Sequence, residues 1–228
     1  MFDNLFYKSI SNFLYEFTYL LLTVCNISIE IINLSDKFYN LAISNHVSEL
    51  DSFILYILFT NEDFKYKWIT DKRFKDYPIL GSWAKYNETI FVSRTDGSGC
   101  KSIKKKTKST DNVIIFPEGT LFYKPMINKN NNLCKKLNIK PYNNVLCPKV
   151  NGFNTLIKIL KPKYITNITL DYVYDDKNFL KNSNEALTLL NIYKNPPKKI
   201  IITIEKLKVN SKTNINDIFR YKDKLLNK

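Results

Sequence analysis

The sequence predicts an α/β domain whose central sheet is mixed, largely parallel and flanked by helices, with an apolar helix at its N-terminus. Short apolar β-type segments alternate with segments of helical periodicity along the chain, which is typical of this fold class. The 228 residues, 44% of them hydrophobic, suffice for one domain with a substantial core. We therefore expect a single domain with an N-terminal helix in 1–26, a core in 27–208 and a polar tail in 209–228.

The first elements follow from apolar runs and their spacing. Residues 5–25 are rich in aromatic and aliphatic side chains and predict a helix. Ile27–Leu34 alternates loosely between apolar and polar residues, which favours a strand, and Phe38–Ile43 is a further short apolar run. From Ser48 to Phe59 the apolar residues recur every three or four positions, which is the period of a helix.

The middle of the chain continues this alternation. Tyr66–Thr70 predicts a strand, and Phe74–Lys85, which contains a proline and a glycine, predicts a short helix after a turn. Thr89–Val92 is strongly β-type. Residues 100–110 form a lysine-rich segment that we expect to be helical, and Asn112–Phe116 predicts a buried strand.

The last third predicts three more strands. Lys124–Asn132 is polar and is expected to be a loop, whereas Val145–Cys147 is strand-like and precedes a proline. Ile165–Tyr174 alternates apolar and polar residues as a half-buried strand does, and Ile200–Leu207 predicts another strand. The residues after Val209 are polar and are expected to lie at the periphery.

The balance of charge points to an anionic partner. Thirty-five basic and 21 acidic residues give a formal charge of +14, which favours nucleic acid, anionic lipid headgroups or phosphorylated small molecules. Aromatic residues are not interleaved with the lysine cluster of 101–108 as a stacking platform for nucleic acid would require. We therefore expect no nucleic-acid partner. The lysine cluster is either a solvated helix face or a docking surface for an anionic membrane.

Cysteine spacing and hydropathy bear on the compartment. The four cysteines are scattered without metal-ligand spacing, so we predict free thiols in a reducing compartment and no metal site. The most apolar stretch, Phe13–Ile32, is interrupted by charged and amide residues and is a poor membrane span. We expect the helix in 5–25 to pack in the core or to lie on a membrane surface.

His46 is the only histidine of the chain, and Asp51 follows it after four residues. A carboxylate bonded to one imidazole nitrogen fixes the tautomer and makes the other nitrogen a better base. Five helical steps place two side chains about 140° apart, so the pair can meet only if His46 lies outside the helix that carries Asp51. Ser48 supports this arrangement as an N-cap, with Asp51 as the partner of a capping box. Alternatively, these residues only begin a helix.

A second motif, Phe116-Pro117-Glu118-Gly119-Thr120, follows an apolar strand directly. It places a carboxylate, a flexible backbone and a hydroxyl at the carboxyl end of a strand, where α/β sheets bind ligands. Exposed N–H groups beside the glycine would suit a phosphate. Taken alone, the pentapeptide could equally be a turn with a solvated glutamate.

Together the two motifs resemble the glycerolipid acyltransferase family. Two more segments add to the resemblance: Ile90–Arg94 is similar to the family's second motif, and Val145–Lys149 with a following Gly-Phe pair is similar to its fourth. The Pro-Lys-x-x-Gly-Phe form looks like the branch of lysocardiolipin and lysophosphatidate acyltransferases. Two positions depart from the pattern, since Glu88 stands where a glycine is usual and Leu121 where an arginine is frequent.

The resemblance implies an O-acyltransferase with its catalytic core in 27–208. Acyl-CoA would be the donor substrate and a lysophospholipid such as lysophosphatidate the acceptor, with no bound cofactor. His46 and Asp51 would be catalytic, and the developing oxyanion would be stabilised by backbone N–H groups near the start of the helix at Ser48. The acceptor phosphate would be bound by Arg94, Glu118, Gly119 and Thr120, and the supporting loops would contain Asn45, Ser48, Pro117, Pro148 and Lys149.

The resemblance also implies a place and an alternative. A lysophospholipid acyltransferase would be membrane-associated, as a peripheral or monotopic protein on the cytoplasm-facing, reducing side. The alternative is a catalytically silent member of the same fold that binds lipid or membrane without turnover.

Overall fold

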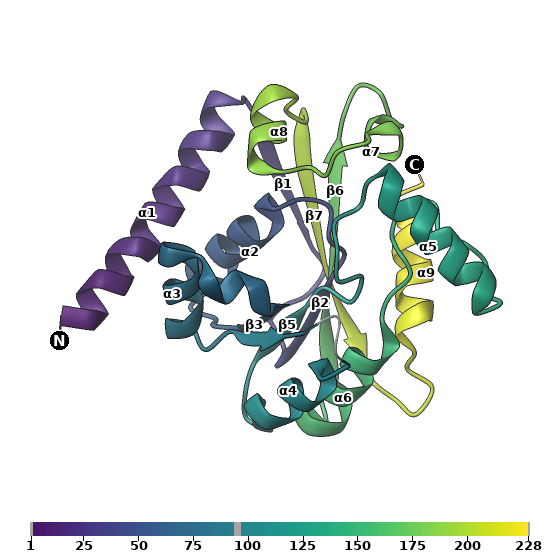
Figure 1. The fold of residues 1–228 in the computed structure, drawn as a ribbon, viewed down its shortest axis with the longest axis horizontal. Coiled ribbons are helices and arrows are strands. Elements are labelled where there is room, and N and C mark those ends of the chain that lie inside the picture. Colours follow the sequence, from purple (N-terminus) through teal and green to yellow (C-terminus); the bar gives the residue numbers. More distant parts are fainter. Residues whose placement is uncertain (1, 94–96, 228) are drawn as a thin grey trace.

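The computed structural model describes residues 2–93 and 97–227, and it forms one seven-stranded sheet with helices on both faces (Figure 1). The strand order is β1-β7-β6-β2-β5-β3-β4. Every neighbouring pair is parallel except β6 and β7. The predicted fold class, a mixed and largely parallel sheet flanked by helices with an N-terminal helix, is therefore confirmed.

The elements of the sheet have the following bounds. The strands are β1 (Ser28–Asn33), β2 (Leu41–Ser44), β3 (Lys67–Asp71), β4 (Ile90–Val92), β5 (Val113–Ile115), β6 (Tyr164–Val173) and β7 (Lys199–Lys208). The helices are α1 (Phe2–Val24), α2 (Leu50–Asn61), α3 (Pro78–Tyr86), α4 (Gly99–Lys106), α5 (Lys124–Lys136), α6 (Val150–Leu160), α7 (Phe179–Asn182), α8 (Leu189–Lys194) and α9 (Ile215–Leu225), with a 3₁₀ turn η1 at Lys72–Asp76.

Two apolar clusters cover the two faces of the sheet. Successive residues of β2 alternate between them: Ala42 lies in the cluster with α2 and α8, and Leu41 and Ile43 lie in the cluster with α4, α6 and α9. All three are fully buried, as expected for a central strand with helices on both faces. Burial of each large aliphatic side chain contributes about 1.5–3 kcal/mol to folding.

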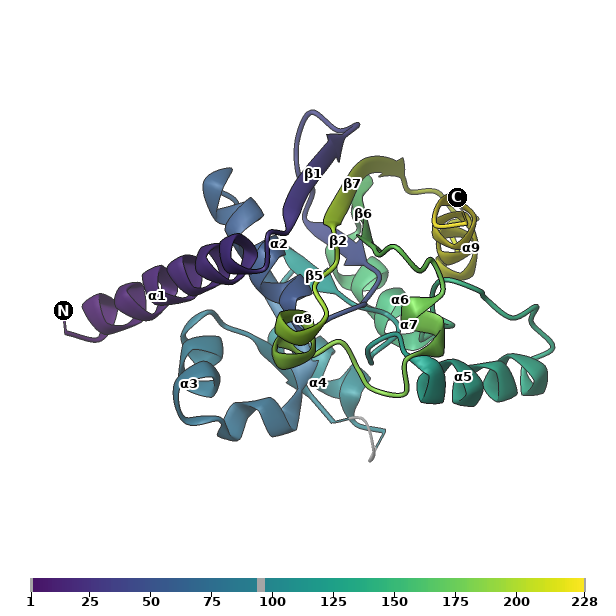
Figure 2. The same cartoon turned by 90° about the horizontal axis from the view of Figure 1, so that it is seen from above.

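Helix α1 projects from the body of the molecule, as Figures 1 and 2 show. One of its faces packs on α2 and α3, with Leu14 buried and Ser11 accepting a hydrogen bond from the indole N–H of Trp83 (3.0 Å). The remainder of its described surface exposes large apolar side chains: Phe6, Phe13, Tyr15, Tyr19, Leu20 and Val24. Among the described residues, no helix combines the length and hydropathy needed to cross a bilayer.

Two polar segments fold differently from the sequence prediction. Lys124–Asn132, predicted as a loop, belongs to helix α5, which starts with a proline in its first turn and buries Cys134. The polar tail after Val209 contains helix α9, where Ile215, Phe219 and Lys222 share one buried face. Their spacing of four and three residues is a helical period, and it was readable in the sequence.

Val145–Cys147 is buried but is not a strand. Its backbone N–H groups are bound by side chains instead of by a neighbouring strand: Leu146 donates to Glu118 (2.7 Å) and Cys147 donates to Asn130 (3.0 Å). The apolar, β-branched composition that favours a strand here reflects burial. Helix α6, which follows directly, was not predicted, although Phe153, Leu156 and Leu160 have helical spacing.

Candidate active site

The sheet brings both sequence motifs to one edge. His46 follows β2, and the Phe116–Thr120 segment follows β5, which pairs with β2 in parallel. The carboxyl ends of the two strands therefore lie side by side at the centre of the sheet. This is the edge at which α/β sheets place ligands.

His46 and Asp51 meet as their spacing predicts. His46 lies in the loop before α2, Asp51 lies in the first turn of that helix, and the imidazole Nδ1 is 2.9 Å from a carboxylate oxygen, Oδ2. The Asp51 side chain is fully buried, whereas 19% of the His46 side chain is exposed. Because Asp51 occupies Nδ1, proton exchange with a substrate falls to Nε2, as in an orienting carboxylate–histidine pair.

Asp51 also fixes the loop that carries His46. Its Oδ2 accepts the backbone N–H groups of Val47 (2.7 Å) and Ser48 (3.0 Å), and its Oδ1 accepts the hydroxyl of Tyr172 from β6 (2.7 Å). Burial, followed by the charge of Asp51, raises the pKa of Tyr172 well above its ordinary value, so Tyr172 stays a neutral donor. Four donors thus hold one buried carboxylate in a single orientation.

Ser48 was predicted as the N-cap of this helix, but the N-cap residue of α2 is Glu49, and Ser48 lies one residue before it. The Ser48 Oγ accepts the N–H of Leu50 (3.1 Å), and the Ser48 N–H donates to Asp51, so the two side chains cap the first turn reciprocally. The helix itself begins at Leu50. Ser48 also donates its hydroxyl to the carbonyl of Leu187 (2.8 Å), which attaches the loop to the segment before α8.

The expected oxyanion donors at this helix start are already in use. The N–H groups of Val47 and Ser48 donate to Asp51, that of Glu49 to the Leu187 carbonyl (3.2 Å) and that of Leu50 to Ser48. The prediction that backbone N–H groups near Ser48 stabilise the oxyanion was therefore wrong. These groups hold the loop of residues 45–49, which carries His46.

The Phe116–Thr120 segment supports His46 through three contacts. Glu118 accepts the backbone N–H of His46 at 2.5 Å, and the Phe116 ring stacks on the imidazole with centroids 4.2 Å apart and planes 20° apart. The N–H of Phe122 donates to the His46 carbonyl (3.1 Å). The segment therefore sets both the backbone and the ring plane of His46.

The carboxylate of Glu118 is turned into the protein. Its Oε2 accepts from His46 and its Oε1 accepts the N–H of Leu146, and only 3% of the residue is exposed. Burial raises the pKa of Glu118 to about 8 against these hydrogen bonds, which lower it. Both oxygens are thus bound by backbone N–H groups inside the protein, in disagreement with the predicted contact between Glu118 and the acceptor phosphate. The Glu118 carboxylate connects the loop of His46 to that of Leu146.

Gly119 and Lys149 lie against each other on the outer side of this turn. Gly119 has φ +69°, which favours glycine, and a Cβ there would lie 2.8 Å from the Lys149 Nζ. The Lys149 N–H donates to the Pro117 carbonyl (2.8 Å), and Pro148 is buried beside it. Thr120 is half-buried next to Gly119. A flexible backbone and an ammonium group therefore lie against each other, and Thr120 is the next residue in the chain.

Asn45 is a clamp between two strands. Its side-chain amide donates to the carbonyl of Leu170 (2.9 Å) and accepts the N–H of the same residue (2.8 Å). This pair continues the β2–β6 pairing by side-chain hydrogen bonds, so the chain can leave β2 and turn into the His46 loop. The predicted supporting role of Asn45 agrees with this geometry.

Arg94, predicted to bind the acceptor phosphate, lies outside the described residues. The departure at Glu88 can be described: its φ is +54°, the left-handed region that favours glycine. The family motif usually has a glycine at this position, and a glycine adopts a positive φ without steric cost. Here the side chain of Glu88 forms an ion pair with Lys67 (2.5 Å) instead.

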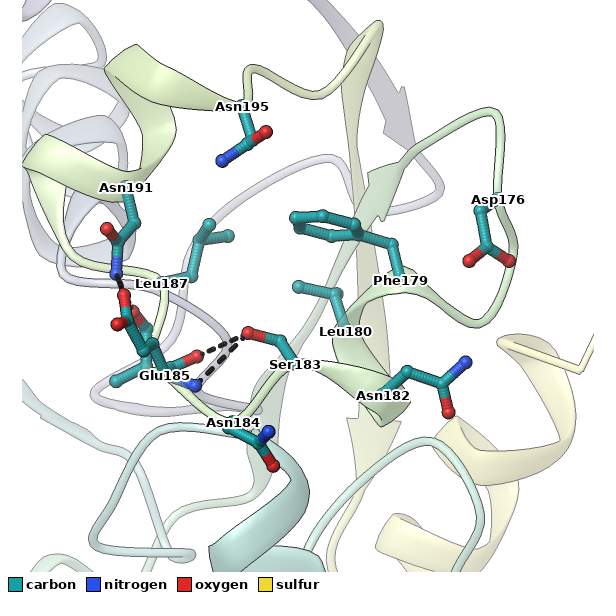
Figure 3. A pocket seen from close by; sticks show the side chains of 11 residues that line it. Asp176, Phe179, Leu180, Asn182, Ser183, Asn184, Glu185, Leu187, Asn191 and Asn195 are labelled. Atoms are coloured by element: carbon teal, nitrogen blue, oxygen red, sulfur yellow. Dashed lines mark hydrogen bonds between the residues drawn. The ribbon is translucent and has the colours of Figure 1, made fainter.

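A recess of about 340 Å³ lies beside the His46 loop, between α7 and α8 (Figure 3). Phe179, Leu180 and Leu187 point into it, and Leu187 is the residue whose carbonyl binds Ser48 and Glu49. No described residue of its lining is basic. The recess therefore suits an uncharged part of a substrate and not a phosphate.

Sequence reasoning missed Tyr172, Leu187 and Phe122 as parts of the site. Tyr172 carries a weak signal, because it lies near the carboxyl end of a predicted strand, where site residues gather. Leu187 and Phe122 contribute backbone groups, so their side chains give no signal of the role.

Comparison with known proteins shows the family and the fold. A family model described as Acyltransferase matches residues 30–161, more than half of the chain. A crystal structure of the 1-acyl-sn-glycerophosphate (LPA) acyltransferase PlsC from Thermotoga maritima is similar, with a TM-score of 0.59 and 14% sequence identity over 96% of this chain and 79% of that chain. No curated protein matches the sequence significantly. The chain therefore belongs to the acyltransferase family, in agreement with the resemblance of its motifs to the glycerolipid acyltransferases.

Proposed function

We propose that this protein transfers a fatty acyl chain from acyl-CoA to the free hydroxyl of a lysophospholipid such as lysophosphatidate. The observation that carries the proposal is the His46–Asp51 pair, which lies at the central carboxyl edge of the sheet with Nε2 left for a substrate. A histidine oriented by a buried carboxylate is suited to remove a proton from a hydroxyl. The fold shared with the Thermotoga maritima LPA acyltransferase supports the acceptor class.

The reaction needs one base and no acyl-enzyme. His46 Nε2 takes the proton of the acceptor hydroxyl while its oxygen attacks the thioester carbonyl. The new C–O bond forms, the C–S bond breaks, and the CoA sulfur leaves as a thiolate that recovers the proton from the imidazolium. Asp51 stabilises the imidazolium formed in between, and the Phe116 ring keeps the imidazole in plane.

The acceptor phosphate would lie on the turn formed by Gly119 and Thr120. Lys149 supplies a positive charge directly against this turn, and the family motif assigns a further one to Arg94. Lysine contributes here as a point charge, without the fork geometry of arginine. The recess between α7 and α8 would take an uncharged part of a substrate, because its described lining contains apolar and amide side chains, the carboxylates of Asp176 and Glu185, and no basic side chain.

The protein is proposed to act at a membrane surface. The exposed apolar face of α1 and the exposed lysines of α4 (Lys101, Lys104, Lys105 and Lys106) suit the boundary between lipid tails and anionic headgroups. Each lysine near such a surface contributes about 1 kcal/mol. Sedimentation with two kinds of vesicle would test membrane binding: one of neutral lipid alone, and one of neutral lipid with about 30% anionic lipid. Binding that ignores both anionic lipid and salt would contradict the electrostatic part.

The alternative is a catalytically silent lipid-binding protein of the same fold. The intact geometry of His46, Asp51 and Glu118 favours the enzyme, because a silent relative has no need of a buried carboxylate oriented by four donors.

The experiment offers a labelled long-chain acyl-CoA with a panel of lysophospholipids that differ in headgroup. Label in a diacyl product from one acceptor would support the proposal and identify that acceptor. Folded protein that binds lipid vesicles but forms no product with any acceptor would instead favour the silent lipid-binding alternative.

A further inference from the structure

A second recess, of about 570 Å³, lies at the edge of the sheet where the central parallel strands start. Of its lining residues, Asn40 directly precedes β2, Asn112 precedes β5 and Lys163 precedes β6. His46 follows the opposite end of β2, where Leu170 of β6 binds the preceding residue of the loop. Lys163 and Leu170 are seven residues apart, so the recess and the catalytic edge are about 23 Å apart along β6.

Three lysines and two tyrosine rings form the charged part of this recess. The ring centroids of Tyr39 and Tyr164 are 5.2 Å apart, and the Lys206 Nζ lies 5.6 Å from the first and 4.5 Å from the second. Lys37 adds a second ammonium group over Tyr39 at 5.9 Å, and Lys163 adds one over Tyr164 at 5.8 Å. Cation–π attraction operates at these distances. The two rings thus gather three ammonium groups in one place.

These three cations face little opposing charge. The Lys206 Nζ lies 4.0 Å from a carboxylate oxygen of Asp36, whose side chain is 75% exposed. Lys37 and Lys163 form no ion pair within the part of the chain that the structure describes. Ammonium groups gathered around neighbouring rings repel one another, and an anion bound among them would relieve this repulsion.

The Tyr39 hydroxyl adds a donor without an acceptor. Its oxygen is buried, and no group of residues 2–93 and 97–227 accepts its hydrogen. Native proteins rarely leave a buried donor unpaired, and a bound ion or water is a common partner in such cases. The Tyr39 backbone is held firmly, because its N–H donates to the Thr166 Oγ1 (2.8 Å) and its carbonyl accepts the Tyr66 hydroxyl (2.5 Å). The donor is therefore in place before a ligand binds, which lowers the entropic cost of binding.

The recess also has an apolar part. Phe38 and Phe64 belong to its lining, with ring centroids 5.7 Å apart, and both are only partly buried against the core. A bare inorganic anion would gain nothing from these rings. A phosphate attached to a carbon skeleton would use both parts of the recess, because the skeleton would cover apolar surface that water now contacts.

We propose that this recess is a second ligand site, which binds an organic phosphate with its phosphate on Lys37, Lys163 and Lys206 and its carbon part on Phe38 and Phe64. Two sources share this chemistry: a soluble nucleotide and a lipid with a phosphate headgroup. The site is separate from the proposed acyltransferase site, and its binding does not depend on that activity.

The test is isothermal titration calorimetry of the full chain with three probes: inorganic pyrophosphate, ADP, and dihexanoyl phosphatidate below its micelle concentration. A double variant, Lys163→Gln with Lys206→Gln, removes two of the ammonium groups. Lys224→Gln is the matched control, because Lys224 is exposed on α9 and does not line the recess. Lys149→Met separates the two phosphate sites, since any binding at the acyltransferase site should weaken in that variant alone.

We expect one of the organic probes to bind about tenfold more tightly than pyrophosphate, and the tighter one identifies the source. The double variant should weaken this binding about thirtyfold, because two charge-assisted contacts are lost. Lys224→Gln and Lys149→Met should change it less than about twofold. Tyr39→Phe should weaken it about fivefold without lowering the urea midpoint, because the deleted hydroxyl has no acceptor in the unliganded protein.

Unchanged binding in the double variant, or an equal loss in Lys224→Gln, would overturn the proposal. Pyrophosphate that binds as tightly as both organic probes would overturn it as well. If the double variant does not fold, Lys37→Gln replaces it, since Lys37 is exposed in the loop before β2, and a loss of about fivefold is then expected. Failure of the proposed function is distinct, because it would abolish the diacyl product and leave this binding in place.

Discussion

Asp51→Asn tests the central pair with little disturbance of the fold. The asparagine oxygen can replace Oδ2 and keep its three donors, and its amide can donate to the Tyr172 hydroxyl, which rotates to accept. What is lost is the negative charge beside the imidazolium. For charges about 4 Å apart at an effective dielectric constant of about 20, this interaction is about 4 kcal/mol.

At about 1.4 kcal/mol for each factor of ten, the loss corresponds to a kcat about 10³-fold lower, with KM nearly unchanged. The assay is steady-state acyl transfer to the preferred lysophospholipid, with thermal unfolding by circular dichroism to show that the variant is folded. Asp63→Asn, at an exposed position in the turn that follows the same helix, is the control and should have full activity. A folded Asp51→Asn protein within about fivefold of full kcat would refute the role assigned to the pair.

Three further predictions concern the turn at Phe116–Thr120. Glu118 has a pKa of about 8 in the folded protein against an ordinary 4.5, so its stabilising contribution is fully present below pH 4.5 and declines as pH rises towards 8, by up to about 1.4 kcal/mol per pH unit. Urea unfolding at successive pH values should show this decline, and its persistence in Glu118→Gln would contradict the assignment. Gly119→Ala should lower the free energy of unfolding by about 1–2 kcal/mol because of the positive φ, and an unchanged urea midpoint would count against the strain argument. Lys149→Met should raise KM for a phosphate-bearing acceptor about fivefold and weaken its salt dependence, and an unchanged KM would remove Lys149 from the phosphate site.

The sequence predicted six of the seven described strands, because their apolar runs are short and bounded by polar breaks, and it marked β2 only as a short apolar run. It also gave the condition under which His46 and Asp51 can meet, namely that His46 lies outside the helix of Asp51, because five helical steps place two side chains about 140° apart. It failed for α5, where only Cys134 is buried and the apolar periodicity is weak. It failed for Val145–Cys147 because burial and strand formation favour the same residue types.

The support of the site was harder to predict than the catalytic pair. Glu118 was assigned to the acceptor phosphate through the family resemblance, and its burial against two backbone N–H groups depends on the loop at Leu146, 28 residues away. The contribution of Tyr172 depends on its contact with Asp51, 121 residues earlier in the sequence. Such contacts are set by strand order and helix docking, which local patterns do not specify.

The most direct test of the central claim is the rate of acyl transfer by His46→Ala beside the unchanged protein, with the acceptor that the panel identifies. Loss of the base should lower kcat by about 10²–10⁴-fold, while thermal unfolding stays cooperative. Added imidazole, which fits the space left against the Phe116 ring, should restore part of the rate. A folded His46→Ala protein that forms the diacyl product at the original rate would contradict the account.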